Sequence, residues 1–196
     1  MMMSGDTSKE TVIDFSKTIY EEAQRLISLV GDIIKISELD EKTAKFEQEI
    51  VDLTELSKEV AERLKPAADS RNITINVLGG VSKVIGVRKI LDEMVSNLVD
   101  NAIKYNKDNG TIDIIVTNSD NKAELIVRDT GIGIPQSEQP RVFERFYCID
   151  KSHSKNIGGT GLGLSIVKHG AMYHNAQISL ESIVDKGTSV KLTFNK

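Results

Sequence analysis

The first part of the chain repeats apolar residues at seven-residue intervals. Two rows follow this spacing, one of Val12, Ile19, Leu26 and Ile33 and one of Phe15, Leu29 and Ile36, with Glu22 interrupting the second. This heptad-like pattern predicts a helix over residues 8–39 with one apolar stripe. A helix of about 32 residues is about 48 Å long. Such a stripe belongs either to a long core helix or, as we favour, to half of a hairpin or bundle that another segment or chain completes.

Shorter patterns follow, and they alternate between strand and helix periods. We expect strands over residues 46–53, 73–78, 81–85, 111–118, 123–129, 177–184 and 188–194. We expect a first helix that is capped by Thr54 and runs to residue 64, with Pro66 helping to end it. Two further helices are expected over residues 93–105 and 162–174, and a short amphipathic piece near 141–147. Mixed strands and helices with adjacent hairpins predict an α+β fold: a two-layer sandwich of a mixed β-sheet and helices, preceded by the long N-terminal helix.

Composition narrows the class of protein. Hydrophobic residues make up 39% of the 196 residues, charged residues 28%, and the net charge is −4. This balance fits a soluble globular protein and argues against nucleic acid as a partner. Cys148 is the single cysteine, so an intrachain disulfide is excluded. No apolar run approaches the roughly 20 residues of a membrane span. We therefore expect a cytoplasmic fragment without membrane contact, which can still belong to a longer, membrane-anchored parent.

The segment 93–105 carries the first candidate chemistry. Glu93, Asn97 and Asn101 recur every four residues and share one helix face, and Lys104 and Tyr105 follow. Asparagine is a mediocre helix former because its side chain competes for backbone hydrogen bonds. Two on one stripe favour a metal–phosphate site, with amide oxygens for a hard cation, a lysine for phosphate and an aromatic ring for a base.

Two glycine-bearing segments add to this picture. Asp129 ends a predicted strand and is followed by Gly131 and Gly133, so a carboxylate stands at a turn where a flat ligand can approach the backbone. Such a carboxylate can accept a hydrogen bond from an exocyclic amine, as adenine offers. The run 158–164 opens a predicted helix whose backbone N–H groups favour phosphate oxygens. It is neither a P-loop nor a good dinucleotide fingerprint, and each segment alone is a weak signal.

Five motifs in order resemble the ATP-binding catalytic domain of sensor histidine kinases, which share a superfamily with type II topoisomerases and mismatch-repair ATPases. They are Glu-x3-Asn-x3-Asn-x2-Lys-Tyr at 93–105, Asp-x-Gly-x-Gly at 129–133, Phe-Glu-Arg-Phe-Tyr at 143–147, Gly-Thr-Gly-Leu-Gly-Leu at 159–164 and Gly-Thr at 187–188. Residues 22–39 resemble the second helix of the family's dimerisation and phosphotransfer hairpin. The resemblance implies a partial hairpin helix over 1–44 and an ATP-binding catalytic domain over 45–196, with a lid over 134–160.

The resemblance also implies roles for single residues. Asn97 would be the Mg²⁺ ligand, Asn101 would contact phosphate or the metal shell, and Lys104 would contact phosphate. Tyr105 would pack on the purine or ribose, and Asp129 would recognise adenine. The other nucleotide-binding residues would be Gly131, Gly133, Gly159, Thr160, Gly161, Leu162, Gly163 and Thr188. Catalysis would rest on Arg145, near the γ-phosphate, with Lys104 and Glu93.

The phosphoacceptor of the family is not found in this sequence. The chain has three histidines, His153, His169 and His174, and none has the acidic residue and arginine of the phosphoacceptor pattern after it. His169 and His174 stand near a helix end that favours positive charge. We expect a fragment that binds Mg-ATP but does not autophosphorylate alone. In the full-length parent, a homodimer through the hairpin, the γ-phosphoryl would pass to a histidine and then to a response regulator.

Several alternatives stay open. Glu93 serves either as a metal-shell or structural hydrogen-bonding group or as the base of a hydrolytic ATPase clamp. A serine kinase of the anti-sigma type and a pure dimerisation module are further alternatives, and the long helix disfavours the former. Cys148 stands where many relatives carry a second lid arginine, which Lys151 is near enough to replace.

Overall fold

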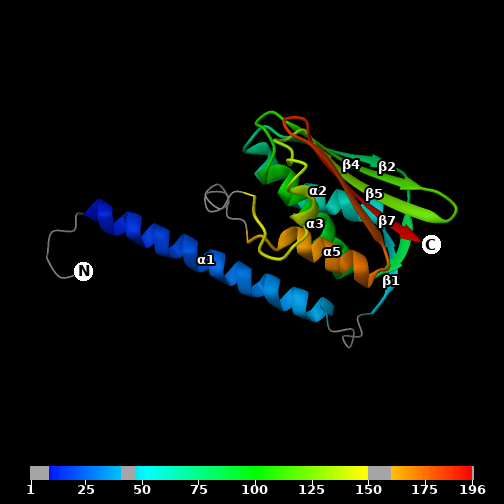
Figure 1. Cartoon of the computed structure of the whole chain (residues 1–196), viewed down its shortest axis with the longest axis horizontal. Coiled ribbons are helices and arrows are strands. Elements are labelled where there is room, and N and C mark those ends of the chain that lie inside the picture. The colour runs from blue at the N-terminus through cyan, green and yellow to red at the C-terminus, as the bar shows by residue number, and fades with distance from the viewer. Residues whose placement is uncertain (1–8, 41–46, 150–159, 196) are drawn as a thin grey trace.

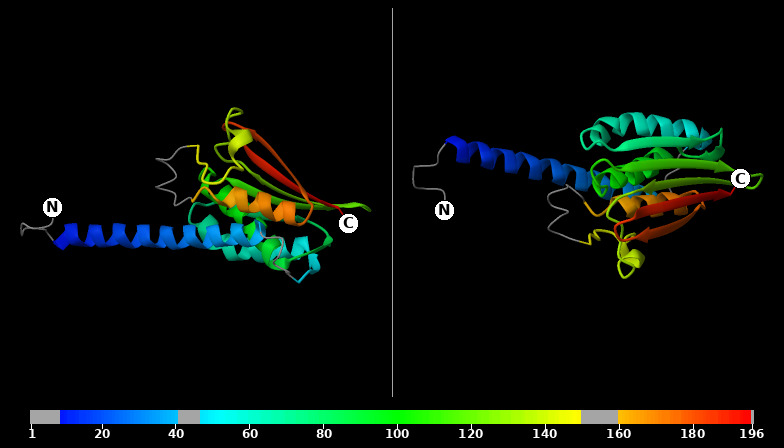
Figure 2. Two further views of the ribbon diagram at one scale, coloured as in Figure 1. Left: turned by 60° about the horizontal axis from the view of Figure 1, so that its bottom comes forward. Right: turned by 90° about the horizontal axis from the view of Figure 1, so that it is seen from above.

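The protein consists of one long helix and a two-layer domain (Figure 1). The structure is a computed structural model and describes residues 9–40, 47–149 and 160–195. Helix α1 (Lys9–Asp40) forms the expected N-terminal helix. Figure 2 shows α1 lying against the helical layer and extending beyond the domain at its N-terminal end. Among the helices of these described ranges, none is long and apolar enough to cross a membrane.

The sheet is mixed, as the sequence predicts. Its five strands have the order β2 (Thr74–Gly79), β4 (Thr111–Asn118), β5 (Lys122–Asp129), β7 (Gly187–Asn195) and β6 (Gln177–Ile183). Strands β2 and β4 are parallel, and the other neighbours are antiparallel. A separate antiparallel pair joins β1 (Glu49–Asp52) to β3 (Lys83–Gly86).

Three helices cover one face of this sheet: α2 (Leu53–Asp69), α3 (Arg88–Lys104) and α5 (Gly163–Tyr173). Alternate residues of the central strands point into the core, such as Ile112 and Ile114 in β4 and Leu125 and Val127 in β5. This period of two is the pattern of a strand with one buried face. The α+β sandwich is therefore confirmed.

The first helix of the domain differs from the prediction at both ends. Asp52, not Thr54, caps α2, and its side chain accepts a hydrogen bond from the N–H of Thr54 at 2.9 Å. Pro66 lies inside the helix, which continues to Asp69. A proline this close to the last turn costs one backbone hydrogen bond but does not force the helix to stop. The reversal occurs at Asn72, whose φ of 54° breaks the helical path.

The predicted amphipathic piece near 141–147 is also different. A short 3₁₀ helix, η1 (Gln139–Arg141), is followed by turns. Pro140 stands in its first turn, where a proline is tolerated, and no α-helix follows in the described part of this segment. Strand β1 begins at Glu49, later than predicted, and Phe46 lies outside the described residues.

Helix α1 contacts the domain through its C-terminal half. Ile36 is only 3% exposed and packs with Leu162 and Ile166, and Leu29 packs against the same cluster. The remaining described members of the two apolar rows are 44–67% exposed, namely Val12, Phe15, Ile19, Leu26 and Ile33. Most of the predicted stripe is therefore open on the surface of this chain.

Candidate functional site

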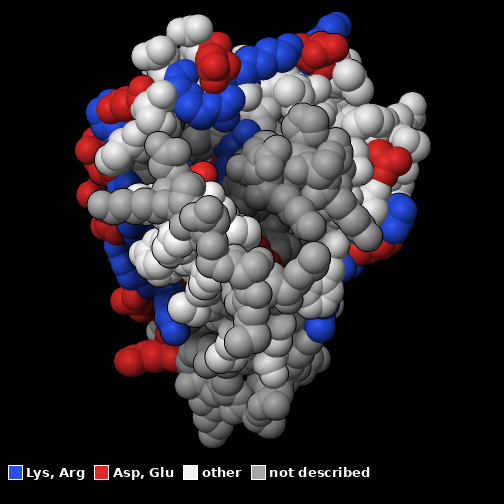
Figure 3. All heavy atoms as spheres, turned by 90° about the vertical axis from the view of Figure 1, so that its left-hand side faces the viewer, with Lys and Arg blue, Asp and Glu red and all other residues white. Residues whose placement is uncertain are grey.

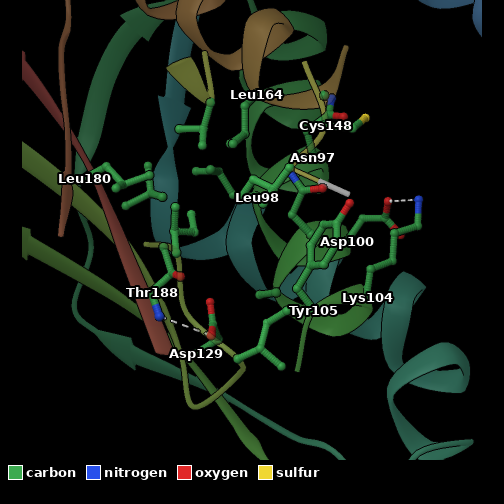
Figure 4. Close-up of a pocket in the computed structure, with 18 of the residues that line it drawn as sticks. Asn97, Leu98, Asp100, Lys104, Tyr105, Asp129, Cys148, Leu164, Leu180 and Thr188 are labelled. Atoms are coloured by element: carbon green, nitrogen blue, oxygen red, sulfur yellow. Dashed lines mark hydrogen bonds and ion pairs between the residues drawn. The ribbon is translucent and has the colours of Figure 1, made fainter. Parts of the chain in front are cut away.

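A cavity of about 620 Å³ lies between α3, the turn after β5, the segment before residue 149 and the start of α5. Ten residues predicted from the motifs line it: Asn97, Asn101, Lys104, Tyr105, Asp129, Gly133, Thr160, Gly161, Gly163 and Thr188. Figure 4 shows several of these side chains facing the same space from three different elements. Acidic and basic side chains are interspersed around the rim of the face seen in Figure 3.

Asp129 lies at one end of the cavity, where β5 ends. Its Oδ1 accepts hydrogen bonds from the N–H of Gly131 at 2.8 Å and of Thr188 at 3.1 Å. Burial raises the pKa of this carboxyl group, and the two backbone hydrogen bonds offset part of that rise. Among the described residues no hydrogen bond to Oδ2 is found, so this oxygen can accept one from a ligand.

Glycine at position 187 allows the close contact that fixes Asp129. Gly187 has a φ of 111°, and a Cβ there would lie 2.0 Å from the carbonyl oxygen of Asp129. Gly131 is as tightly placed, since its Cβ would lie 2.3 Å from the carbonyl oxygen of Tyr105. The glycines thus bring β7 and the end of α3 against the Asp129 turn.

The end of α3 is held by an arginine that no motif indicated. The guanidinium of Arg71 donates hydrogen bonds to the carbonyl oxygens of Ile103 at 2.6 Å, Lys104 at 3.1 Å and Asn106 at 2.8 Å. Two of these carbonyls belong to the last residues of α3 and the third to Asn106 just after it, at a helix end where carbonyl oxygens lack intrahelical partners. The carboxylate of Asp108 binds the same guanidinium at 3.0 Å. Arg71 therefore fixes the backbone that presents Lys104 and Tyr105.

Lys104 and Tyr105 occupy the side of the cavity next to α3. The ammonium group of Lys104 pairs with the carboxylate of Asp100 at 2.7 Å, one turn earlier. Burial raises the pKa of the Tyr105 hydroxyl, so the ring is neutral at physiological pH. Figure 4 shows this ring facing the cavity between Asp129 and Asn97.

Asn97 is oriented by its own helix. Its amide nitrogen donates to the carbonyl oxygen of Glu93 at 2.9 Å, which turns its amide oxygen toward the second glycine segment. A Cβ on Gly163 would lie 2.9 Å from that oxygen. Gly163 therefore leaves room at the amide group of Asn97, for which the family resemblance predicts a metal-ligand role.

Four of the predicted site residues that the structure describes are not among those that line the cavity. The carboxylate of Glu93 binds Lys35 of α1, and Arg145 binds His169 of α5 at 3.1 Å. Gly131 acts through its N–H, and Leu162 is fully buried beside Ile166. Gly159 lies outside the described residues, as do His153 and Lys151. The assigned roles of Glu93 and Arg145 stay predictions.

Some residues of the cavity wall were missed from the sequence. Ser28 and Asp32 come from α1, which no motif placed at the cavity, and Val142, Tyr147 and Cys148 come from the segment predicted as a lid, in which they were not named as binding residues. Tyr147 is held by Glu138 through its hydroxyl group and by Arg141 over its ring, 4.3 Å from the centroid. The apolar row of α1 predicted a helix–helix contact, but no local signal indicated contact with the cavity.

His174 has a structural role. Its Nε2 accepts a hydrogen bond from the N–H of Val87 at 3.0 Å, and its Nδ1 lies 2.8 Å from the carbonyl oxygen of Gly170. These partners require a neutral ring with the proton on Nδ1. Burial lowers the pKa of the imidazole, which agrees with a neutral ring. His174 is therefore neutral, although a positive charge is favourable at this helix end.

Comparison with known proteins places this geometry in a family. A family model described as "Histidine kinase-, DNA gyrase B-, and HSP90-like ATPase" matches residues 86–196. The sensor-like histidine kinase SenX3 of Mycolicibacterium smegmatis is 35% identical over 194 residues, which cover 98% of this chain and 50% of that protein. The sensor histidine kinase WalK of Bacillus subtilis is 30% identical over 190 residues, 95% of this chain and 31% of that protein.

Solved structures agree with this result. The mycobacterial sensor histidine kinase MprB superposes with a TM-score of 0.67 at 30% identity, covering 76% of this chain and 97% of that chain. Full-length ShkA, solved in complex with AMPPNP, shares the fold with a TM-score of 0.80 at 22% identity, covering 97% of this chain and 40% of that chain.

The chain spans half or less of the length of the two curated relatives named above. The matched residues include α3, the Asp129 turn, the start of α5 and the last two strands, which form most of the cavity wall. The chain thus belongs to the family of histidine kinase-, DNA gyrase B- and HSP90-like ATPases, and within it to the ATP-binding catalytic domains of sensor histidine kinases.

Proposed function

We propose that this chain is the ATP-binding catalytic part of a two-component sensor histidine kinase. The observation that carries the proposal is the arrangement of one cavity, with a half-buried carboxylate, Asp129, at one end and Asn97, Lys104 and the start of α5 along the rest. This order suits a nucleotide, which needs a base-recognising acceptor at one end and phosphate-binding groups at the other.

In this proposal the adenine amino group donates to Asp129, and Tyr105 packs beside the purine or ribose. The phosphates lie toward Asn101, Lys104 and residues 160–163. The N–H groups at the start of α5 then face phosphate oxygens, an arrangement that the helix dipole favours.

Mg²⁺ fits the groups that are present. Within the described ranges no cluster of three or more His, Cys, Asp or Glu side chains can hold a metal ion. Mg²⁺ commonly takes one or two protein oxygens and completes its shell with phosphates and water. The amide oxygen of Asn97, with Asn101 beside it, would supply the protein share. When bound, the ion neutralises phosphate charge during transfer.

The reaction proposed for the full-length parent is phosphoryl transfer to a histidine. An imidazole nitrogen attacks the γ-phosphorus, the bond from that phosphorus to the bridging oxygen breaks, and ADP leaves with that electron pair. Lys104 and Arg145 would stabilise the charge on the phosphoryl group, which makes the step mainly one of positioning and electrostatics. Arg145 would have to exchange His169 for phosphate. The phosphoryl group would then pass to a response regulator.

The open rows on α1 support a homodimer of the parent. Val12, Ile19 and Leu26 are more than half exposed, and such rows at heptad spacing are typical of helices that pack on a partner helix. We also propose that the parent is anchored in the cell membrane with this part on the cytoplasmic side.

Isothermal titration with Mg-ADP tests the core of the proposal. Binding at micromolar to millimolar ligand is expected, and no heat of binding at millimolar ligand would overturn it. A hydrolytic clamp is the second candidate, and it predicts ATP turnover by this chain alone with nucleotide-driven dimerisation. The Glu93–Lys35 pair argues against it, because a general base must be free to approach water. A phosphate-release assay combined with light scattering decides between the two.

A further inference from the structure

Helix α1 forms part of the nucleotide cavity. Ser28 and Asp32 of this helix line the cavity together with Asn97 and Thr160. Thr160 lies just before α5, in the segment to which the proposed function assigns the phosphates. The helix that the sequence relates to dimerisation therefore also places a carboxylate at the phosphate end of the site.

One hydrogen bond joins the two elements. The hydroxyl group of Thr160 donates to Oδ2 of Asp32 at 3.0 Å, and the same hydroxyl oxygen accepts from the N–H of Leu162 at 3.3 Å. A threonine hydroxyl has a single proton to donate. While Asp32 accepts that proton, a phosphate oxygen cannot.

Asp32 is held in this position by its neighbours on α1. Lys35 lies 3.7 Å from Oδ1 of Asp32 and also binds the carboxylate of Glu93 on α3. Ile36 is buried against Leu162 and Ile166 at the start of α5. The side chain of Asp32 is only 17% exposed in this arrangement.

We propose that Asp32 is a specificity-determining residue of the nucleotide site: with α1 docked, it competes with nucleotide phosphate for the hydroxyl proton of Thr160. Its negative charge adds repulsion toward phosphate in the same region. Docking of α1 and binding of phosphate therefore oppose each other, whereas adenine recognition at Asp129 is unaffected. This inference rests on the proposed function, because it assumes that the cavity binds an adenine nucleotide.

The coupling works in both directions. If docked α1 weakens phosphate binding, then bound phosphate must weaken α1 docking by the same factor. The nucleoside alone lacks the competing group and leaves α1 where it is. The site would thus sense the phosphates of its ligand through a residue that lies more than 60 positions before the nearest nucleotide-binding motif residue, Asn97.

The test compares Asp32→Ala with Asp14→Ala, which removes the same charge from an exposed position of the same helix. Isothermal titration is carried out on the full chain with adenosine, Mg-ADP and a non-hydrolysable Mg-ATP analogue. Asp32→Ala should bind the two phosphorylated ligands about five- to tenfold more tightly than the unmutated chain, which is the lower range of typical coupling between sites. It should bind adenosine with the same affinity as the unmutated chain. Asp14→Ala should bind all three ligands with the same affinity as the unmutated chain.

Unchanged or weaker binding of both phosphorylated ligands by Asp32→Ala would overturn the inference, and weaker binding would assign Asp32 to holding the phosphates with their metal. If neither the variants nor the unmutated chain bound adenosine or ADP, the proposed function itself would be contradicted. Alanine is a good helix former, so the variant should keep α1 helical.

Hydrogen exchange gives the reciprocal measurement. Saturating Mg-ADP should accelerate amide exchange in residues 29–36 of the unmutated chain, and adenosine should leave the exchange rate unchanged. Equal exchange with both ligands would contradict the coupling.

Discussion

Two opposing effects act on the carboxyl group of Asp129. Burial raises its pKa, yet two backbone N–H groups hold one of its oxygens in a fixed place. The sequence indicated this residue, because a strand followed by Asp-x-Gly-x-Gly is a local pattern. Arg71 has no such pattern, and its role appears only when the end of α2 is brought against the end of α3. Site residues that act through tertiary contacts could not be predicted.

Replacing Asp129 tests its role in base recognition. Asp129→Asn should weaken Mg-ADP binding by about 1.5–3 kcal/mol, the size of a hydrogen bond to a charged group, because the amide is a weaker acceptor. Titration calorimetry measures the difference, with Asp120→Asn in the exposed β4–β5 turn as the control. Equal affinity in both variants would remove Asp129 from the site.

The raised pKa of Asp129 predicts how nucleotide binding depends on pH. The carboxylate form accepts the hydrogen bond, so affinity should fall as the pH decreases through the pKa of Asp129, which lies above 3.8. Binding by Asp129→Asn should lack this component, and the difference between the two titrations isolates it from protonation of the ligand. Parallel curves for the two proteins would contradict the assignment.

His174 should make folding stability depend on pH. Its pKa is lowered below 6.5 in the folded state, so the unfolded chain binds more protons between these two values. The free energy of unfolding should therefore be highest above pH 6.5 and decrease as the pH falls toward the lowered pKa. Urea unfolding at a series of pH values measures this, and His174→Gln should lose less stability over the same range. An identical decrease in both proteins would assign the effect to other groups.

At the level of elements, the apolar periods predicted the type of almost every helix and strand, since each element buries one face. The predicted start of α2 was wrong because it depends on competition between local caps. Asp52 and Thr54 are both acceptable capping residues, and the end of β1 at Asp52 decides between them. The contact between α3 and α5 was not predictable either. It requires a small residue at one position of α5, and the apolar pattern of that helix does not indicate which position this is.

Gly170 is that small residue. A Cβ at this position would lie 2.6 Å from Sδ of buried Met94 on α3. Gly170→Ala gains up to about 1 kcal/mol in helix propensity, but overpacking of a tight core costs about 1–3 kcal/mol. We expect a net loss in the free energy of unfolding, measured with urea. Gly31→Ala on α1, where a Cβ meets nothing within 4 Å, should show no loss. A stabilised Gly170→Ala would mean that α3 and α5 can separate slightly.

At the level of the whole molecule, the open rows of α1 predict self-association. Ile19→Glu places a charge in the row and should reduce the concentration-dependent dimerisation that we expect, measured by sedimentation velocity. Gln24→Glu makes the same change in charge on the other side of the helix, and should leave association as it is. If the unmutated chain stayed monomeric at the highest concentration reached, α1 alone would not form the dimer interface.

The strand order of the sheet also determines when this domain can fold during synthesis. Strand β7 lies between β5 and β6 although it follows both in the chain. Before the ribosome has passed residue 195, β5 has an unpaired edge and β6 has no neighbour in the sheet, so the nascent domain presents two strands open to other chains. The N–H of Thr188 that holds Asp129 arrives with the same strand. The growing chain therefore completes the hydrogen bonds that hold Asp129, the carboxylate proposed to recognise the base, only when the interior strand of its sheet is in place.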